Sequence, residues 1–251
     1  MQFDVTVLMA VLIAYVVIVQ IMLAIKGQYL AILYRVGGKM LVAIPAFFFV
    51  PIHELSHLVA AFVCGHKIEK VRLFQLDFDV TGTLGYVEHS YKPSLLSHFT
   101  NLIIGLAPIA GGASTVCMIA MFEIFELFSP DAYVSDFQWV GALNAIHYAI
   151  DTVKANYSNA SFWFMALIGL NIVIFSVPSN QDFKGAEKGL ALTVLLLIAT
   201  ALFEQTRFLS EFFVNVTMFY VFPVLIASAL LIGITCMILL PFSLIIRKRK
   251  G

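Results

Sequence analysis

The residues best suited to chemistry form one short run, His53-Glu54-Leu55-Ser56-His57. Positions i and i+4 of an α-helix share a face, so two imidazoles at this spacing can meet one zinc ion. Glu54 follows the first imidazole and can take a proton from a zinc-bound water without binding the metal itself. The run therefore predicts a hydrolytic zinc centre with His53 and His57 as ligands and Glu54 as general base.

The surroundings of this run are apolar, with MLVAIPAFFFVPI before it and LVAAFVCG after it. Ionisable side chains inside a membrane span are costly unless they are paired or functional. A helix end whose polar residues are hydrated at the membrane surface is the alternative, because Gly65 follows soon after His57. The metal interpretation is favoured because one span holds both imidazoles and the acid in ligand register.

Two histidines leave a catalytic zinc site short of one protein ligand when water holds the fourth position. Asp182 is the expected third ligand, because it directly follows an apolar run and approaches the same side of the membrane as the histidines. Its alternative role is to cap a helix. The other candidates for the third ligand are Glu88, His66, His89, His98 and His147.

The composition indicates an integral membrane protein. Of 251 residues, 61% are hydrophobic and 12% are charged, whereas soluble domains carry about a quarter charged residues. The net charge of zero gives no sign of a nucleic-acid partner. The three cysteines form no CxxC pair, so neither a disulfide framework nor a cysteine zinc site is expected.

The elements that must position the site are mainly helices. We expect an all-α polytopic membrane protein, a single domain over residues 1–251, with a small β-hairpin in the 65–96 segment between the second and third spans. Gly105 and Pro108 suggest a break in the third span. An interfacial helix is expected around Trp139–Ala149. About six spans of roughly 20 residues are predicted at about 5–25, 40–64, 97–126, 161–178, 189–204 and 214–246.

Basic residues favour an orientation with both termini in the cytoplasm and the site towards the cytoplasmic side. The segments that would then lie inside carry ten Lys and Arg, and the outside segments carry five. The five outside residues are Lys26, Arg35, Lys39, Lys154 and Arg207.

Two asparagines in apolar surroundings are candidates for contact with a substrate or an oxyanion. Asn101 opens the third span, where helix capping or interhelical hydrogen bonding is the stronger alternative. Asn171 lies inside the fourth span, and for it the two interpretations are balanced.

The His53–His57 run on an apolar helix, the following hairpin with Gly85-Tyr-Val, and an aspartate after a Pro resemble the site-2 protease family of intramembrane metalloproteases. The similarity covers about residues 40–190 through sparse motifs. It implies a zinc enzyme that cuts membrane-protein substrates in or near transmembrane segments, with His53, His57 and Asp182 on the metal and Glu54 as base. The family's Leu-Asp-Gly core is replaced here by Gln-Asp-Phe-Lys-Gly.

Two other functions fit the same residues. A transporter or ion-pathway protein could line its route with the ionisable residues of the span, although no inverted repeat is visible. A non-proteolytic homologue could bind zinc or client helices without cutting them. Zinc content and proteolysis would favour the enzyme, whereas flux without proteolysis would favour the transporter.

Overall fold

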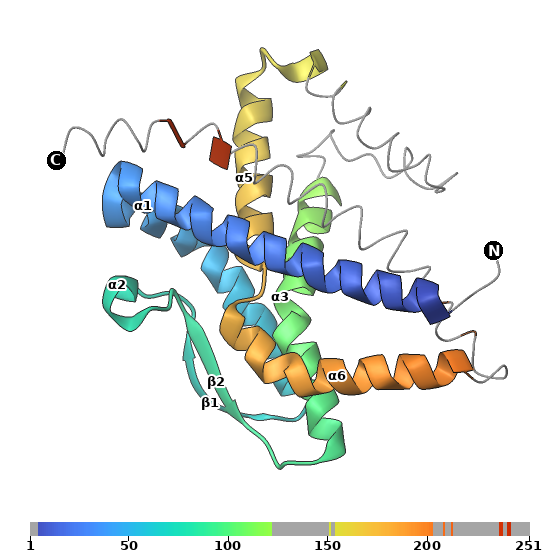
Figure 1. Cartoon of the computed structure of the whole chain (residues 1–251). Coiled ribbons are helices and arrows are strands. Elements are labelled where there is room, and N and C mark those ends of the chain that lie inside the picture. The colour runs from blue at the N-terminus through green and yellow to red at the C-terminus, as the bar shows by residue number, and fades with distance from the viewer. Residues whose placement is uncertain are drawn as a thin grey trace.

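The computed structural model describes residues 5–121 and 154–202 and the isolated positions 151, 208, 212, 236, 237, 240 and 241. The described part is mostly helical, with one small sheet (Figure 1). Within it, two helices are long and apolar enough to cross a membrane, and a bent helix pair gives a third if it forms one broken span. The expected interfacial helix at 139–149 lies outside the described residues, and so does the sixth span at 214–246 apart from the helical positions 236, 237, 240 and 241.

The first helix, α1 (Val5–Val63), is bent at Gly38, whose φ of 68° and ψ of −159° are not helical. Figure 1 shows its two arms diverging from this bend; we call residues 5–37 the first arm and 39–63 the second arm. The predicted non-helical connection at 26–39 is therefore wrong. Its residues continue the helix as far as the bend, where Gly tolerates a positive φ that other residues avoid.

The predicted hairpin is confirmed. Strands β1 (Lys67–Arg72) and β2 (Tyr86–Ser90) pair antiparallel, and a short helix, α2 (Phe78–Thr81), lies between them. The tip of the hairpin contacts the start of the second arm, where Lys39 Nζ lies 2.7 Å from Asp79 Oδ1. The predicted orientation assigned these two residues to opposite sides of the membrane, whereas the hairpin runs back along the arm and joins them (Figure 1).

Helix α3 (Leu95–Met121) continues through Pro108 without the suggested break. Its glycines serve close packing instead. A Cβ on Gly111 would lie 1.8 Å from Ser56 Oγ of α1, and one on Gly112 would lie 1.9 Å from Ser176 Oγ. Helix α1 and the helix that ends at Ser176 can pack this closely against α3 because α3 has no side chains at Gly111 and Gly112.

Helix α5 (Ala160–Ser176) matches the predicted span at 161–178. Helix α6 (Asn180–Leu202) begins nine residues before the predicted span at 189–204 and is bent by 56° from α5. These helices meet the criteria for a membrane span only as a pair, so two separate spans were an overestimate. The polar first turns of α6, which include Lys184 and Lys188, account for the difference. Buried side chains of α5 and both arms of α1 form the core, among them Tyr29, Val50 and Ile174.

Candidate metal centre

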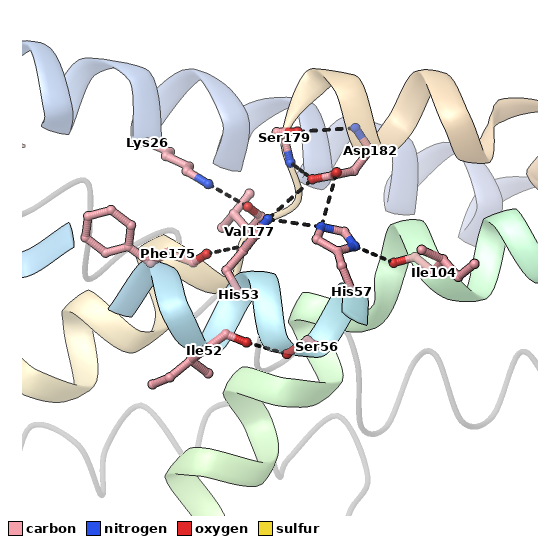
Figure 2. A network of polar contacts seen from close by, with 10 residues as sticks. All are labelled: Lys26, Ile52, His53, Ser56, His57, Ile104, Phe175, Val177, Ser179 and Asp182. Carbon is pink, nitrogen blue, oxygen red and sulfur yellow. Dashed lines mark hydrogen bonds and ion pairs between the residues drawn. The ribbon is translucent and has the colours of Figure 1, made fainter. Parts of the chain in front are cut away.

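Three side chains from two distant segments converge at the centre of the helices (Figure 2). His57 Nε2 lies 3.2 Å from His53 Nε2 and 3.2 Å from Asp182 Oδ1. His53 Nε2 lies 3.5 Å from Asp182 Oδ2. Both imidazoles are buried, with 8% and 7% of their residue surfaces exposed. This buried group could hold a metal ion, and the structure brings Asp182 to the two histidines as the sequence predicted.

Backbone carbonyls fix the tautomers of both imidazoles. His53 Nδ1 lies 2.7 Å from the carbonyl oxygen of Phe175, and His57 Nδ1 lies 2.8 Å from that of Ile104. A carbonyl can only accept a hydrogen bond, so each Nδ1 carries the proton in the neutral ring. The Nε2 lone pairs of both rings therefore face inward, as they do when a backbone carbonyl orients a histidine ligand.

The local sequence explains why these two carbonyls are free. The amide of residue 108 would normally bond the carbonyl of Ile104 in α3, but Pro108 has no N–H. Phe175 lies in the last turn of α5, where carbonyls lack partners within the helix. Pro108, predicted to break α3, instead leaves a free acceptor for His57.

Asp182 is held by the start of α6. The Ser179 N–H donates to Asp182 Oδ2 at 2.5 Å, and the Asp182 N–H donates to Ser179 Oγ at 3.2 Å. This reciprocal pair is a capping box, which satisfies two amides at the helix end. The alternative capping role of Asp182 is therefore real, and it coexists with the approach of the same carboxylate to both imidazoles (Figure 2).

The arrangement suits a cation. Two inward lone pairs and a carboxylate share no hydrogen atom between them, so without a cation they would repel one another. Around a tetrahedral zinc ion with ligands at about 2.0–2.1 Å, neighbouring ligand atoms stand about 3.4 Å apart. The three observed separations, 3.2, 3.2 and 3.5 Å, match that edge length.

Glu54 lies beside this group without joining it. It is 6% exposed, and no described residue gives it a hydrogen bond or an ion pair. The turn into β2 covers it, because a Cβ on Gly85 would lie 2.9 Å from Glu54 Cγ. A buried carboxylate without a partner is costly and usually serves a function.

Sequence reasoning missed Lys26. It was counted as a residue of an outside loop, but it lies in the first arm of α1 and donates to the carbonyl of Val177 at 2.6 Å (Figure 2). Val177 is five residues from Asp182, at the end of α5. The signal that could have found it is a single lysine between two apolar runs of one long helix.

The two asparagine candidates differ. Asn171 is 4% exposed, its Oδ1 accepts from Tyr29 Oη at 3.2 Å, and its Nδ2 donates to the Leu167 carbonyl at 2.8 Å. It therefore links α5 to the first arm of α1. Asn101 is 9% exposed and has no hydrogen bond to another described residue. Whether either residue contacts a substrate or an oxyanion stays a prediction.

The remaining third-ligand candidates stand away from the group. His66 and His89 contact each other at the base of the hairpin, with their Nδ1 atoms 3.0 Å apart. Glu88 pairs with Lys70 on the hairpin surface at 3.2 Å. His98 belongs to no metal-capable group of described residues, and His147 lies outside them.

Comparison with known proteins adds no family assignment. The chain matches no protein family, no curated protein and no solved structure. The buried group and the elements that surround it are therefore the features that indicate a function.

Proposed function

We propose that the chain is an intramembrane zinc endopeptidase that hydrolyses peptide bonds in or near transmembrane segments of other membrane proteins. The observation that carries the proposal is the set of three facing ligand atoms next to the buried carboxylate of Glu54, which forms no hydrogen bond or ion pair with a described residue. A helix long and apolar enough to span a membrane carries the two histidines, and the bent α5–α6 pair carries Asp182. The similarity of its motifs to the site-2 protease family supports the same conclusion.

Zinc suits this set of ligands. Two imidazoles and one carboxylate are a common ligand set of catalytic zinc, in which the fourth position is left to water. Harder ions such as Mg²⁺ and Ca²⁺ prefer all-oxygen sites. Bound zinc would polarise a water molecule and a peptide carbonyl.

Glu54 is suited to move the proton in this reaction. It is adjacent to His53 in sequence, it shares the buried centre, and its carboxylate has no other described partner to compete for a proton. In the proposed cycle Glu54 takes a proton from the attacking water and gives it to the leaving amine. The new C–O bond forms first, and the C–N bond breaks when the amine nitrogen has received the proton from Glu54.

The hairpin offers a surface for the substrate. A helical peptide shields its own carbonyls, so a scissile segment must become extended before attack. Among the described residues, each strand of the two-stranded sheet pairs with another strand on one side only, so its other edge could pair with an added strand. Because Gly85 directly precedes β2 and lies against Glu54, a strand added along β2 would run beside the proposed base.

Proteoliposomes test the proposal. Wild-type protein is reconstituted with a panel of single-span membrane proteins, and cleavage is followed beside Glu54→Gln and a surface control, Glu187→Gln, at an exposed position of α6. We expect zinc-dependent cleavage by wild type and by Glu187→Gln, and a loss of about 10²–10⁴-fold in Glu54→Gln. The Glu54→Gln protein should retain its metal.

Other results would point elsewhere. Cleavage by Glu54→Gln at the normal rate would remove Glu54 from the mechanism. Ion flux through the same liposomes without proteolysis would favour a transporter. Bound zinc with neither cleavage nor flux across the panel would favour the non-proteolytic homologue.

A further inference from the structure

The starting observation is the lysine that joins the first arm of α1 to the end of α5. Lys26 is half-buried, and its ammonium donates to the carbonyl of Val177 at 2.6 Å. The structure gives the ammonium no second hydrogen bond among the described residues. An ammonium at this depth in an apolar helix is costly, which is why such residues are usually functional.

The carbonyl that Lys26 holds belongs to the segment that places Asp182. Val177 ends α5 in an extended conformation, with φ −64° and ψ 123°, and Pro178 follows it. The N–H of the next residue, Ser179, binds Asp182 Oδ2. Fixing the Val177 carbonyl therefore fixes the linker whose amide holds the third ligand, as Figure 2 shows.

A second hydrogen bond between α1 and α5 makes it possible to distinguish placement of Asp182 from general docking of α1 on α5. Tyr29 lies one turn after Lys26 on the same face of α1, and its hydroxyl donates to Asn171 Oδ1 at 3.2 Å. That bond also joins α1 to α5, but it reaches the body of α5 rather than the linker. The two bonds thus provide a matched pair: both hold the helices together, and one of them reaches the ligand segment.

We propose that Lys26 is a positioning residue for the metal centre, which sets the 177–179 linker so that Asp182 faces His53 and His57. The inference rests on the metal-binding part of the proposed function and does not depend on proteolysis. The ammonium also sits at the negative end of the α5 dipole, where a cation is favoured. Lys26 acts through the backbone of Val177, and no contact with substrate is assigned to it.

The test measures zinc affinity by competition with a chelator in the purified full-length protein. Lys26→Met removes the charge and the hydrogen bond, and it should weaken zinc binding by about 10–100-fold, as loss of ligand-orienting groups typically does. Lys26→Arg keeps a cationic donor and should restore affinity to within about threefold of wild type. Lys39→Met, which removes an exposed lysine of the same helix, should leave affinity unchanged.

Two further measurements keep the test decisive. Tyr29→Phe breaks the other α1–α5 bond and should leave zinc affinity within about threefold of wild type. The visible absorption of Co²⁺-loaded protein should change in Lys26→Met and not in Tyr29→Phe, because only the former disturbs Asp182. If Lys26→Met folds too poorly to assay, Lys26→Gln is measured in its place.

Unchanged affinity in Lys26→Met would overturn the inference while leaving the proposed protease intact. Equal weakening in Lys26→Met and Tyr29→Phe would overturn it too, because general docking of α1 would then explain both. Lysine-dependent zinc binding without cleavage of any substrate would contradict the protease and uphold the role of Lys26.

Discussion

Two pairs of histidines in this chain stand at nearly the same separation and have different surroundings. In the buried pair, His53 and His57 approach through their Nε2 atoms at 3.2 Å. In the pair at the base of the hairpin, His66 and His89 approach through their Nδ1 atoms at 3.0 Å. The close approach of two imidazoles therefore does not define a metal centre.

The difference lies in what is contacted by the ring nitrogens that point away from the partner histidine. His66 Nε2 lies 2.9 Å from Thr100 Oγ1, and that hydroxyl donates to the Ser97 carbonyl. The threonine oxygen must then accept from His66 Nε2–H, which leaves the His66 Nδ1 lone pair free to accept a hydrogen bond from His89 Nδ1–H. The outer pair is thus a satisfied hydrogen bond. In the buried pair each Nδ1 donates to a carbonyl, so both Nε2 lone pairs face Asp182, an arrangement that a bound cation would satisfy.

Removal of a metal ligand should give the largest loss of zinc affinity, and it should distinguish the His53–His57 pair from the His66–His89 pair. His53→Ala and His57→Ala each remove a direct ligand, so zinc affinity should fall by more than the roughly 100-fold that marks the upper end for ligand-orienting groups. His66→Ala and His89→Ala should keep wild-type affinity. Isothermal titration or chelator competition measures all four variants. Equal losses in the two pairs would contradict the distinction.

A smaller effect is expected where the hairpin meets the buried centre. Gly85→Ala places a Cβ 2.9 Å from Glu54 Cγ and from two backbone carbonyls, so Glu54 or the hairpin must shift. Cleavage should fall by about tenfold or more, up to the roughly 10²–10⁴-fold that general acid–base catalysis contributes. Zinc content should stay at the wild-type level. Gly169→Ala is the control, because nothing lies within 4 Å of its Cβ. Full activity in Gly85→Ala would mean that the strand does not constrain the base.

Pro108→Ala should weaken zinc binding through the backbone. The new N–H competes with His57 for the Ile104 carbonyl, so zinc affinity should fall by about tenfold or less, at the lower end for ligand-orienting groups. Pro45→Ala is the control, because Pro45 lies inside α1 and takes part in none of the hydrogen bonds and ion pairs described above for the three ligands. Chelator competition measures both variants. Zinc affinity that is unaffected by Pro108→Ala would show that the free carbonyl is not needed.

The smallest expected effect is the pH dependence of hairpin stability, which involves His66 and His89 at the base of the hairpin. Burial lowers the pKa of His66. Burial is also the largest cause that lowers the pKa of His89, and the nearby His66 lowers it further. A histidine whose pKa is lower when folded loses stabilisation as pH falls below its unfolded value of about 6.5. Hydrogen exchange of the hairpin amides should therefore quicken below that pH in wild type and change less in His89→Gln. The same pH dependence in both would locate the titrating group elsewhere.

The sequence predicted the parts of the site that depend on local periodicity. The i, i+4 spacing placed His53 and His57 on one helical face, and alternating β-prone residues predicted the hairpin. The number of predicted spans placed Asp182 on the same side of the membrane as His53 and His57. The predicted span at 189–204 follows the apolar residues alone, whereas α6 begins earlier, at the capping box of Ser179 and Asp182.

The rest depends on contacts between distant segments, which no local pattern encodes. Nothing near Lys26 in sequence indicates that it meets Val177, 151 residues away. The same holds for Lys39 and Asp79, whose contact shows that the hairpin folds back along the second arm. Pro108 was recognised as a lost helix donor, but the ligand that uses the freed carbonyl came from another helix.

The central claim is that His53, His57 and Asp182 bind one zinc ion between them. X-ray absorption at the zinc edge of the purified wild-type protein tests it most directly. We expect one zinc per chain, with two imidazole ligands and oxygen ligands at about 2.0–2.1 Å, and loss of one imidazole or of the ion in His57→Ala. Protein that binds no zinc, or zinc whose imidazole signal survives His57→Ala and disappears in His66→Ala, would contradict the claim.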